Sequence, residues 1–176
     1  MRSLIRRARR MTWMFCAVVA LGAPLRASAQ QLSYFLQISG IDGESTDDRH
    51  ANWIDLSSMS FSLASQRPSD FHFTTGVSSA TPALLLAAAS GQSIPNAVVA
   101  VRRGVPNNPD FLTYTLADVV VTSQGNDGSS TGSRQGESFA LSYSRLQISY
   151  RPQRPDGSYG PPVTSCWDFV AGAPCS

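Results

Sequence analysis

The stretch FALSYSRLQISY, residues 139–150, decides the fold. Successive side chains of a β-strand point to opposite faces of the sheet. Here the apolar side chains take odd positions in the first half and even positions in the second: Phe139, Leu141, Tyr143, Leu146, Ile148 and Tyr150. Because a one-residue slip turns every later side chain to the other face, we predict a β-bulge near Ser144 or Arg145. A bulge bends its strand, as a closed barrel requires.

Alternation of apolar and polar residues predicts strands elsewhere in the chain as well. The expected strands are 32–38, 58–63, 71–73, 97–103, 111–122 and 163–169. In strand 58–63 the serines are expected to face solvent, and in strand 71–73 two phenylalanines flank His72. Together with residues 139–150 this gives about seven strands.

One substantial helix is expected, over residues 83–90. Thr81 can cap it, Pro82 suits its first turn and Gly91 suits its exit. Residues 124–136 are rich in Gly, Ser and Asn and are predicted to form a mobile loop. Such a loop can cradle an anion through its amides, although a flexible linker is the commoner meaning. The pattern is mainly β and favours an antiparallel barrel or sandwich.

The amino-terminal residues read as a secretory signal peptide, residues 1–29. Five arginines precede an apolar run from Met11 to Leu21, and the small residues Ala27 and Ala29 place the cleavage between Ala29 and Gln30. Twin-arginine export and an upstream start codon are the alternatives. The run is shorter than the roughly 20 residues of a membrane helix, so no stable membrane insertion is expected. Residues 30–176 then form one domain, periplasmic or secreted.

Charge argues against nucleic acid as a partner. Removing residues 1–29 takes away six of the 14 basic residues and none of the 12 acidic ones, which changes the formal charge from +2 to −4. The chain has no lysine, and the remaining arginines are scattered. A basic face, the usual mark of a nucleic-acid binder, is therefore not expected.

Two cysteines remain after this cleavage, Cys166 and Cys175, separated by a turn through Gly172 and Pro174. In an oxidising compartment they are expected to form a disulfide, and two free thiols are the alternative. Closing so short a loop contributes roughly 2–3 kcal/mol in the chain-entropy model. The bridge would fix the carboxyl-terminal end.

Catalytic motifs are absent from the sequence. It contains no P-loop and no Gly-x-Gly-x-x-Gly fingerprint, so we predict neither an enzyme nor a cofactor. The acidic segment 42–50 could in principle hold a metal ion, but its spacing favours a solvated loop. His72 is expected to face solvent or a subunit contact.

Taken in order, these residues resemble the haemolysin-coregulated protein (Hcp) family of the bacterial type VI secretion system. The resemblance is carried by YFLQISGIDGES at 34–45, LSSMS at 56–60, DFHF at 70–73, the helix with LLL at 84–86, ADVVV at 117–121, Glu137-Ser138, Asp156-Gly157 and Trp167-Asp168. Asp48, His50 and Ile54 stand at the family's spacing. The resemblance covers nearly all of residues 30–176.

The resemblance implies a small antiparallel β-barrel with one flanking helix. It also implies a non-catalytic subunit that forms six-membered rings, which stack into a tube that carries effectors and works with a sheath and a spike. Asp42, Glu44, Asp48 and His50, with the 124–136 loop, are then the candidate subunit contacts. The alternative is an exported barrel of this family that acts as a periplasmic or extracellular binding module without forming a tube.

Overall fold

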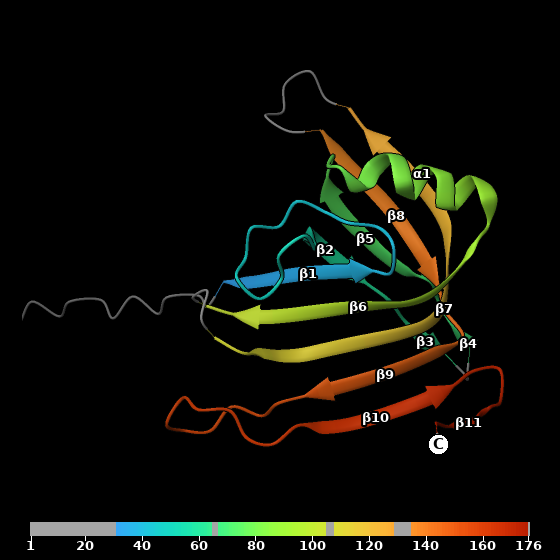
Figure 1. The fold of residues 1–176 in the computed structure, drawn as a ribbon. Helices are drawn as coiled ribbons and strands as arrows, with labels where there is room; N and C mark the ends of the chain where they lie inside the picture. Colours follow the sequence, from blue (N-terminus) through green and yellow to red (C-terminus); the bar gives the residue numbers. More distant parts are fainter. Residues whose placement is uncertain (1–30, 65–66, 105–107, 129–134, 176) are drawn as a thin grey trace, which may run out of the picture.

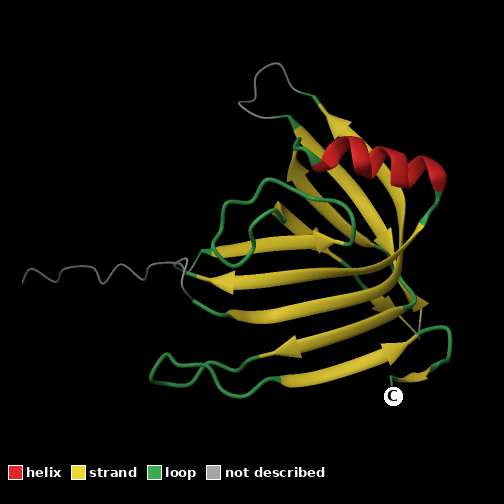
Figure 2. Cartoon of the chain, in the orientation of Figure 1, coloured by secondary structure: helices red, strands yellow, loops and turns green. Residues whose placement is uncertain are grey.

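A computed structural model describes residues 31–64, 67–104, 108–128 and 135–175 (Figures 1 and 2). The described residues contain one helix, α1 (Ala80–Ser90), between β5 and β6. The strands are β1 (Leu32–Ile38), β2 (Ile54–Ser60), β3 (Leu63–Ala64), β4 (Arg67–Pro68), β5 (Phe71–Gly76), β6 (Ser93–Arg103), β7 (Asp110–Asp127), β8 (Gly136–Ser142), β9 (Arg145–Tyr150), β10 (Val163–Asp168) and β11 (Ala173–Pro174).

Six strands close into an antiparallel barrel (Figure 2). Around the barrel the order is β1, β2, β5, β8, β7 and β6, and β6 pairs with β1 to complete the circuit. Beyond β7 the sheet continues outside the barrel through β9, β10 and β11. The predicted mainly β class, an antiparallel barrel with one flanking helix, is confirmed, and the sandwich alternative is excluded.

The long strand β7 belongs to both parts of the sheet. Its first part pairs with β9 and its last part with β8, so β8 and β9 run one after the other along the same neighbour. Between them the Ser144 amide donates to the Ala117 carbonyl at 3.0 Å, opposite Asp118, whose φ is 52°. The predicted irregularity near Ser144 therefore lies where expected. It is a break between two strands rather than a bulge within one, because β8 completes the barrel whereas β9 begins the extension.

Part of the predicted mobile loop is strand. β7 continues to Asp127 and β8 begins at Gly136, so the loop prediction was wrong for 124–127 and for Gly136; residues 129–134 lie outside the described residues. Gln124 pairs with Phe139 of β8, and its side-chain Nε2 donates to Glu137 Oε1 at 2.8 Å. Backbone pairing with β8 makes this stretch a strand although its side chains are too polar for a strand pattern.

Helix α1 packs against β7 with Ala80, Leu84 and Ala87 buried. The expected exit is confirmed, since Gly91 takes a φ of 62° and its amide donates to the Ala87 carbonyl at 3.0 Å. The expected cap was wrong. Ser79 is the N-cap residue, whereas the Thr81 hydroxyl lies inside the first turn and donates to Glu137 Oε2 at 2.6 Å.

Aromatic side chains fill much of the barrel interior. Phe71 and Phe73 on β5 are buried with ring centroids 5.7 Å apart, and Phe139 on β8 stacks on Phe73 at 5.2 Å. His72 between them is exposed, as the alternation predicts. The same alternation is incomplete for β1, where Phe35 is also buried, because a chain segment covers the second face of that strand.

The carboxyl-terminal residues form the edge of the extension, near the mark C in Figure 1. β10 forms where it was predicted, and β11 folds back onto its last two residues. Cys166 and Cys175 are joined by the predicted disulfide, with their Cα atoms 5.3 Å apart. Nowhere in the described ranges is a helix both long and apolar enough to cross a membrane.

Candidate subunit-contact surface

The segment between β1 and β2, residues 39–53, lies over the outer face of β1. It folds on itself: the amides of Gly43 and Ser45 donate to the carbonyls of Asn52 and Trp53 at 2.8 and 2.9 Å. Gly43 approaches the Trp53 backbone so closely that an added Cβ would overlap the carbonyl oxygen. Only glycine fits there. The local sequence thus fixes the shape of the segment that carries the candidate contact residues.

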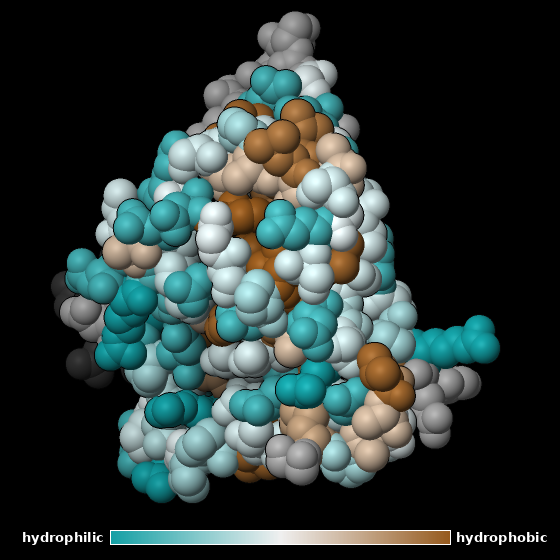
Figure 3. All heavy atoms as spheres, turned by 45° about the vertical axis from the view of Figure 1, so that its right-hand side comes forward, coloured by the Kyte–Doolittle hydropathy of each residue, from teal (hydrophilic) through white to brown (hydrophobic). Residues whose placement is uncertain are grey.

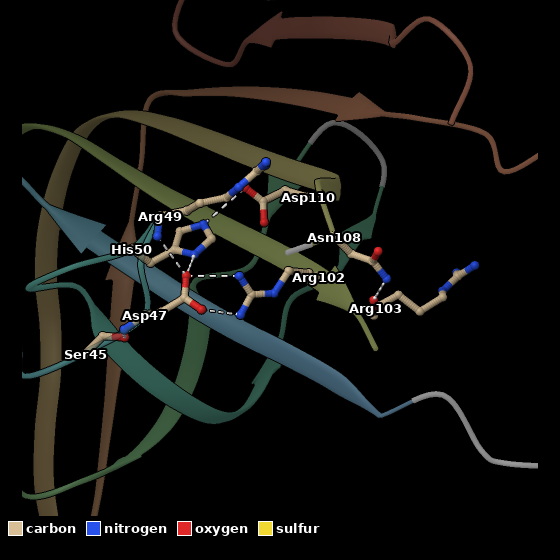
Figure 4. A network of polar contacts seen from close by, with 8 residues as sticks. All are labelled: Ser45, Asp47, Arg49, His50, Arg102, Arg103, Asn108 and Asp110. Atoms are coloured by element: carbon tan, nitrogen blue, oxygen red, sulfur yellow. Dashed lines mark hydrogen bonds and ion pairs between the residues drawn. The ribbon is translucent and has the colours of Figure 1, made fainter. Parts of the chain in front are cut away.

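A buried histidine fastens this segment to the barrel (Figure 4). His50 is 2% exposed. Its Nδ1 lies 2.8 Å from Asp47 Oδ1, and its Nε2 lies 3.1 Å from Oδ2 of Asp110, at the start of β7. Each ring nitrogen of His50 thus lies within hydrogen-bond distance of a carboxylate oxygen. His50 therefore links the segment to a strand 60 residues away in the sequence.

Arg102 on β6 completes this network. Its Nη1 donates to Asp47 Oδ1 at 3.0 Å, its Nη2 donates to Asp47 Oδ2, and its guanidinium lies over the Phe35 ring, 4.9 Å from the centroid. The ring of His50 stacks on the same phenylalanine at 4.2 Å. The Arg102 guanidinium holds the pKa of the Asp47 carboxyl well below its usual value, and the Asp47 carboxylate in turn raises the pKa of Arg102. The buried guanidinium of Arg102 is thus matched by the partly buried carboxylate of Asp47, next to the Phe35 ring.

Of the four sequence-predicted contact residues, three are on the surface. Asp42, Glu44 and Asp48 are exposed, whereas the side chain of His50 is engaged inside its own subunit. Glu44 also has an internal partner, since its Oε1 accepts the Ser79 amide at 2.9 Å, next to α1. The structure therefore divides the set into three exposed carboxylates and one histidine that positions the segment.

Two hollows adjoin these carboxylates. One, of about 450 Å³, is lined by Glu44, Asp55 and the end of β5; the other, of about 420 Å³, is lined by Asp47, Asp48 and again Asp55. Asp55 on β2 is exposed between them. Glu44, Asp48 and Asp55 thus form one acidic surface.

The pairing of His50 with two carboxylates limits the reactions that this surface could support. Both ring nitrogens of His50 face carboxylates, so neither is left to activate a hydroxyl nucleophile. Within the described residues no three His, Cys, Asp or Glu side chains are grouped so that they could hold a metal ion. What the arrangement can do is present fixed negative charge to a neighbouring surface.

An apolar area lies on a different part of the molecule. Leu85 and Leu86 of α1 are 55% and 70% exposed, and a hollow of about 410 Å³ runs beside Leu86. In Figure 3 apolar atoms gather near the top of the face shown, where α1 lies. The helix therefore has a buried side toward β7 and an uncovered apolar side.

The network partners Arg102 and Asp110 were not predicted. The sequence signals Arg102 only as a basic residue near the end of a strand, and nothing in the pattern pairs it with a residue 55 positions away. Closure of the barrel brings β6, β7 and the β1–β2 segment together. The proposed cleavage residues Ala29 and Gln30 lie outside the described residues.

Comparison with known proteins agrees with this architecture. Residues 35–150 match the family described as "Type VI secretion system effector, Hcp". Protein hcp1 of Pseudomonas aeruginosa is 31% identical over 151 residues, which cover 77% of this chain and 93% of that protein.

Solved structures give the same result. Hcp1 from Salmonella typhimurium superposes with a TM-score of 0.76 at 32% identity, covering 82% of this chain and 99% of its own. A type VI secretion system effector from Yersinia pestis gives a TM-score of 0.67 at 26% identity, covering 77% of this chain and 98% of its own. The likeness thus extends over almost the entire length of both structures.

Proposed function

This chain belongs to the Hcp family of the type VI secretion system, and we propose that it is a tube subunit that forms six-membered rings. In this proposal the rings stack into a hollow tube, which carries effector proteins and works with a sheath and a spike. The family role is structural, and we propose no catalytic activity and no cofactor for this chain.

The closed six-stranded barrel with helix α1 on its flank carries the proposal. It supports a tube role because its likeness to Salmonella Hcp1 covers 99% of that chain at 32% identity, which leaves no large part of the relative without a counterpart here. A shared fold alone would not indicate a shared role. Here the fold is accompanied by a family match over residues 35–150.

Ring closure requires a heterologous contact, in which one surface meets a different surface of the next copy. We propose that the exposed carboxylates Asp42, Glu44 and Asp48 form one side of that contact. His50 takes part indirectly, because its bonds to Asp47 and Asp110 hold the segment that carries them. Exposed charges of this kind mainly set orientation and specificity between subunits.

We also propose that residues 1–29 act as an export signal, with cleavage between Ala29 and Gln30. Arg-rich residues followed by the apolar run from Met11 to Leu21 support this. The Cys166–Cys175 bridge supports it independently, because disulfides persist in oxidising compartments. The mature chain would then be periplasmic or secreted.

The second candidate function follows from that bridge. An exported barrel of this family that binds a ligand without forming a tube would also keep a signal and a disulfide. In that case the acidic surface of Glu44, Asp48 and Asp55 would face a basic ligand rather than a second copy.

The two candidates differ in how the chain leaves the cell. We would measure it in the culture medium of the source bacterium, in strains that lack either the contractile sheath or residues 1–29. A tube subunit disappears from the medium when the sheath is absent. Release that is independent of the sheath but lost without residues 1–29 would contradict the tube role and support the exported binding module.

A further inference from the structure

The carboxyl-terminal segment, residues 169–175, turns back along β10 at the edge of the sheet extension (Figure 1). Its first residue reaches the barrel. The Phe169 amide donates to the Ser144 carbonyl at 2.9 Å, at the break between β8 and β9. The Phe169 ring meets the Tyr143 ring edge to face, with centroids 5.7 Å apart. The segment therefore covers the place where the barrel gives way to its extension.

Tyr143 is the residue that Phe169 covers. It is 8% exposed, and among the described residues its hydroxyl has no hydrogen-bond partner. Its ring also lies 5.6 Å from Phe71 in the aromatic interior. Any movement of Phe169 thus changes the surroundings of a tyrosine that is part of the core.

Local contacts between Phe169 and the end of the segment are few. Asp168 Oδ1 accepts the amides of Val170 and Ala171 at 2.9 and 2.8 Å, which makes a tight turn. After the turn, β11 is only two residues long, and the Cys175 amide donates to the Cys166 carbonyl at 3.3 Å. Val170 is 83% exposed. So short a pairing at a sheet edge has little stability of its own.

The disulfide is the one covalent contact here, and it joins the two ends of this turn. Cys166 lies on β10, and Cys175 follows β11. Both cysteines are half-buried, so a small thiol can approach them. The bridge closes the segment behind Phe169 while leaving the barrel strands free of any covalent link.

We infer that the Cys166–Cys175 disulfide is a redox-controlled clamp on the carboxyl-terminal segment, which keeps Phe169 packed on Tyr143 when oxidised and releases it when reduced. A dithiol reductant supplies the two electrons and two protons. Its thiolate attacks one bridge sulfur, the bond between Cys166 and Cys175 breaks, and a mixed disulfide forms. The second thiol of the reductant resolves it, leaving two cysteine thiols and the oxidised reductant.

With this clamp, the exposure of the aromatic side chains at the β8–β9 break depends on the redox conditions of the compartment. Where disulfides persist, the segment stays closed and Tyr143 stays covered. Where thiols are kept reduced, residues 169–175 detach, and the aromatic side chains at the β8–β9 break become accessible. The barrel itself remains closed in both states, because its strand pairing does not involve the bridge.

Hydrogen exchange on the full chain, with and without dithiothreitol, tests this inference. We expect the amides of Phe169, Val170, Ala171 and Cys175 to exchange at least about tenfold faster in the reduced protein, because local opening is no longer limited by the bridge. Amides of the central strand β6 should not change. The double variant Cys166→Ser/Cys175→Ser should behave as the reduced protein and ignore the reductant.

Two results would overturn the inference. Equal protection of the Phe169 amide in both redox states would mean that the packing on Tyr143 needs no clamp. Loss of protection in β6 as well would mean that the bridge holds the whole barrel. The variant Phe169→Ala, which keeps the bridge, gives a second measurement: its Cys175 amide should stay protected until reductant is added.

Discussion

Asp47 connects the buried charges of the β1–β2 segment, since it contacts both His50 and Arg102. Its carboxyl pKa is lowered by that pairing, so the unfolded chain takes up a proton at a higher pH than the folded one. The stabilisation is present above the unfolded pKa of about 4 and is lost as the pH falls from there toward the lower folded pKa. We therefore expect the free energy of unfolding to decrease between pH 5 and pH 3, measured by urea denaturation.

Removal of the carboxylate should have a larger effect at neutral pH. In Asp47→Asn the guanidinium of Arg102 stays buried without its counter-charge, a change that typically destabilises by about 3–5 kcal/mol. Asp48→Asn is the matched control, because Asp48 is the exposed neighbour and should change stability by less than about 0.5 kcal/mol. Equal losses in the two variants, or an unchanged acid response in Asp47→Asn, would contradict the assigned role of Asp47.

Gly43 gives a second test at the scale of one residue. Gly43→Ala places a methyl group against the Trp53 backbone, which cannot yield without opening the segment. We expect a loss of about 1–3 kcal/mol, the range found for overpacked sites. Gly76→Ala is the control, since an added Cβ there has nothing within 4 Å and φ is not positive. Thermal unfolding of both variants makes the comparison, and a Gly43 variant as stable as the Gly76 variant would refute the close approach.

Among the elements, helix α1 is held against the barrel by the buried side chains on one of its sides. Leu84 is fully buried against the barrel, whereas Leu86, two residues later, is 70% exposed. We expect Leu84→Ala to lower the free energy of unfolding by about 2–5 kcal/mol through cavity formation. Leu86→Ala should change it by less than about 0.5 kcal/mol, as at most exposed sites. If urea denaturation gave similar losses for both, the helix would pack differently.

At the scale of single elements, the sequence predicts those features that depend on residues close together in the chain. The alternation around Phe71 and Phe73, the exit at Gly91 and the irregularity near Ser144 all follow from periodicity or backbone preference. The last part of β7 could not be found in this way. Residues 124–127 lack an apolar face and become strand because β8 lies beside them, a long-range pairing that no local window contains.

In the candidate site, too, local sequence predicts some residues, whereas long-range contacts determine the others. The exposed carboxylates of the β1–β2 segment could be predicted because their segment is polar and precedes a strand. The burial of His50 could not, because it depends on Asp110 and Arg102, which reach it only through closure of the barrel. The burial of Phe35 on β1 could not be predicted either, since the sequence does not show that a chain segment covers the second face of that strand.

At the scale of the assembly, charge reversal tests the proposed contact. Glu44→Arg and Asp48→Arg should each reduce ring formation, because the neighbouring surface would meet the opposite charge. Asp156→Arg is the control, since Asp156 is also exposed but lies on the β9–β10 connection. The number of rings per field in negative-stain microscopy gives the readout. Normal ring formation in both contact variants would remove the β1–β2 segment from the interface.

The mass of the full chain in solution tests the central claim most directly. Light scattering coupled to size-exclusion chromatography, in the absence of reductant, separates a ring from a single barrel. A tube subunit predicts a mass six times that of one chain, with ring-shaped particles in the same fraction. A stable monomer at every concentration tested would contradict the tube role and leave an exported barrel whose ligand is to be found.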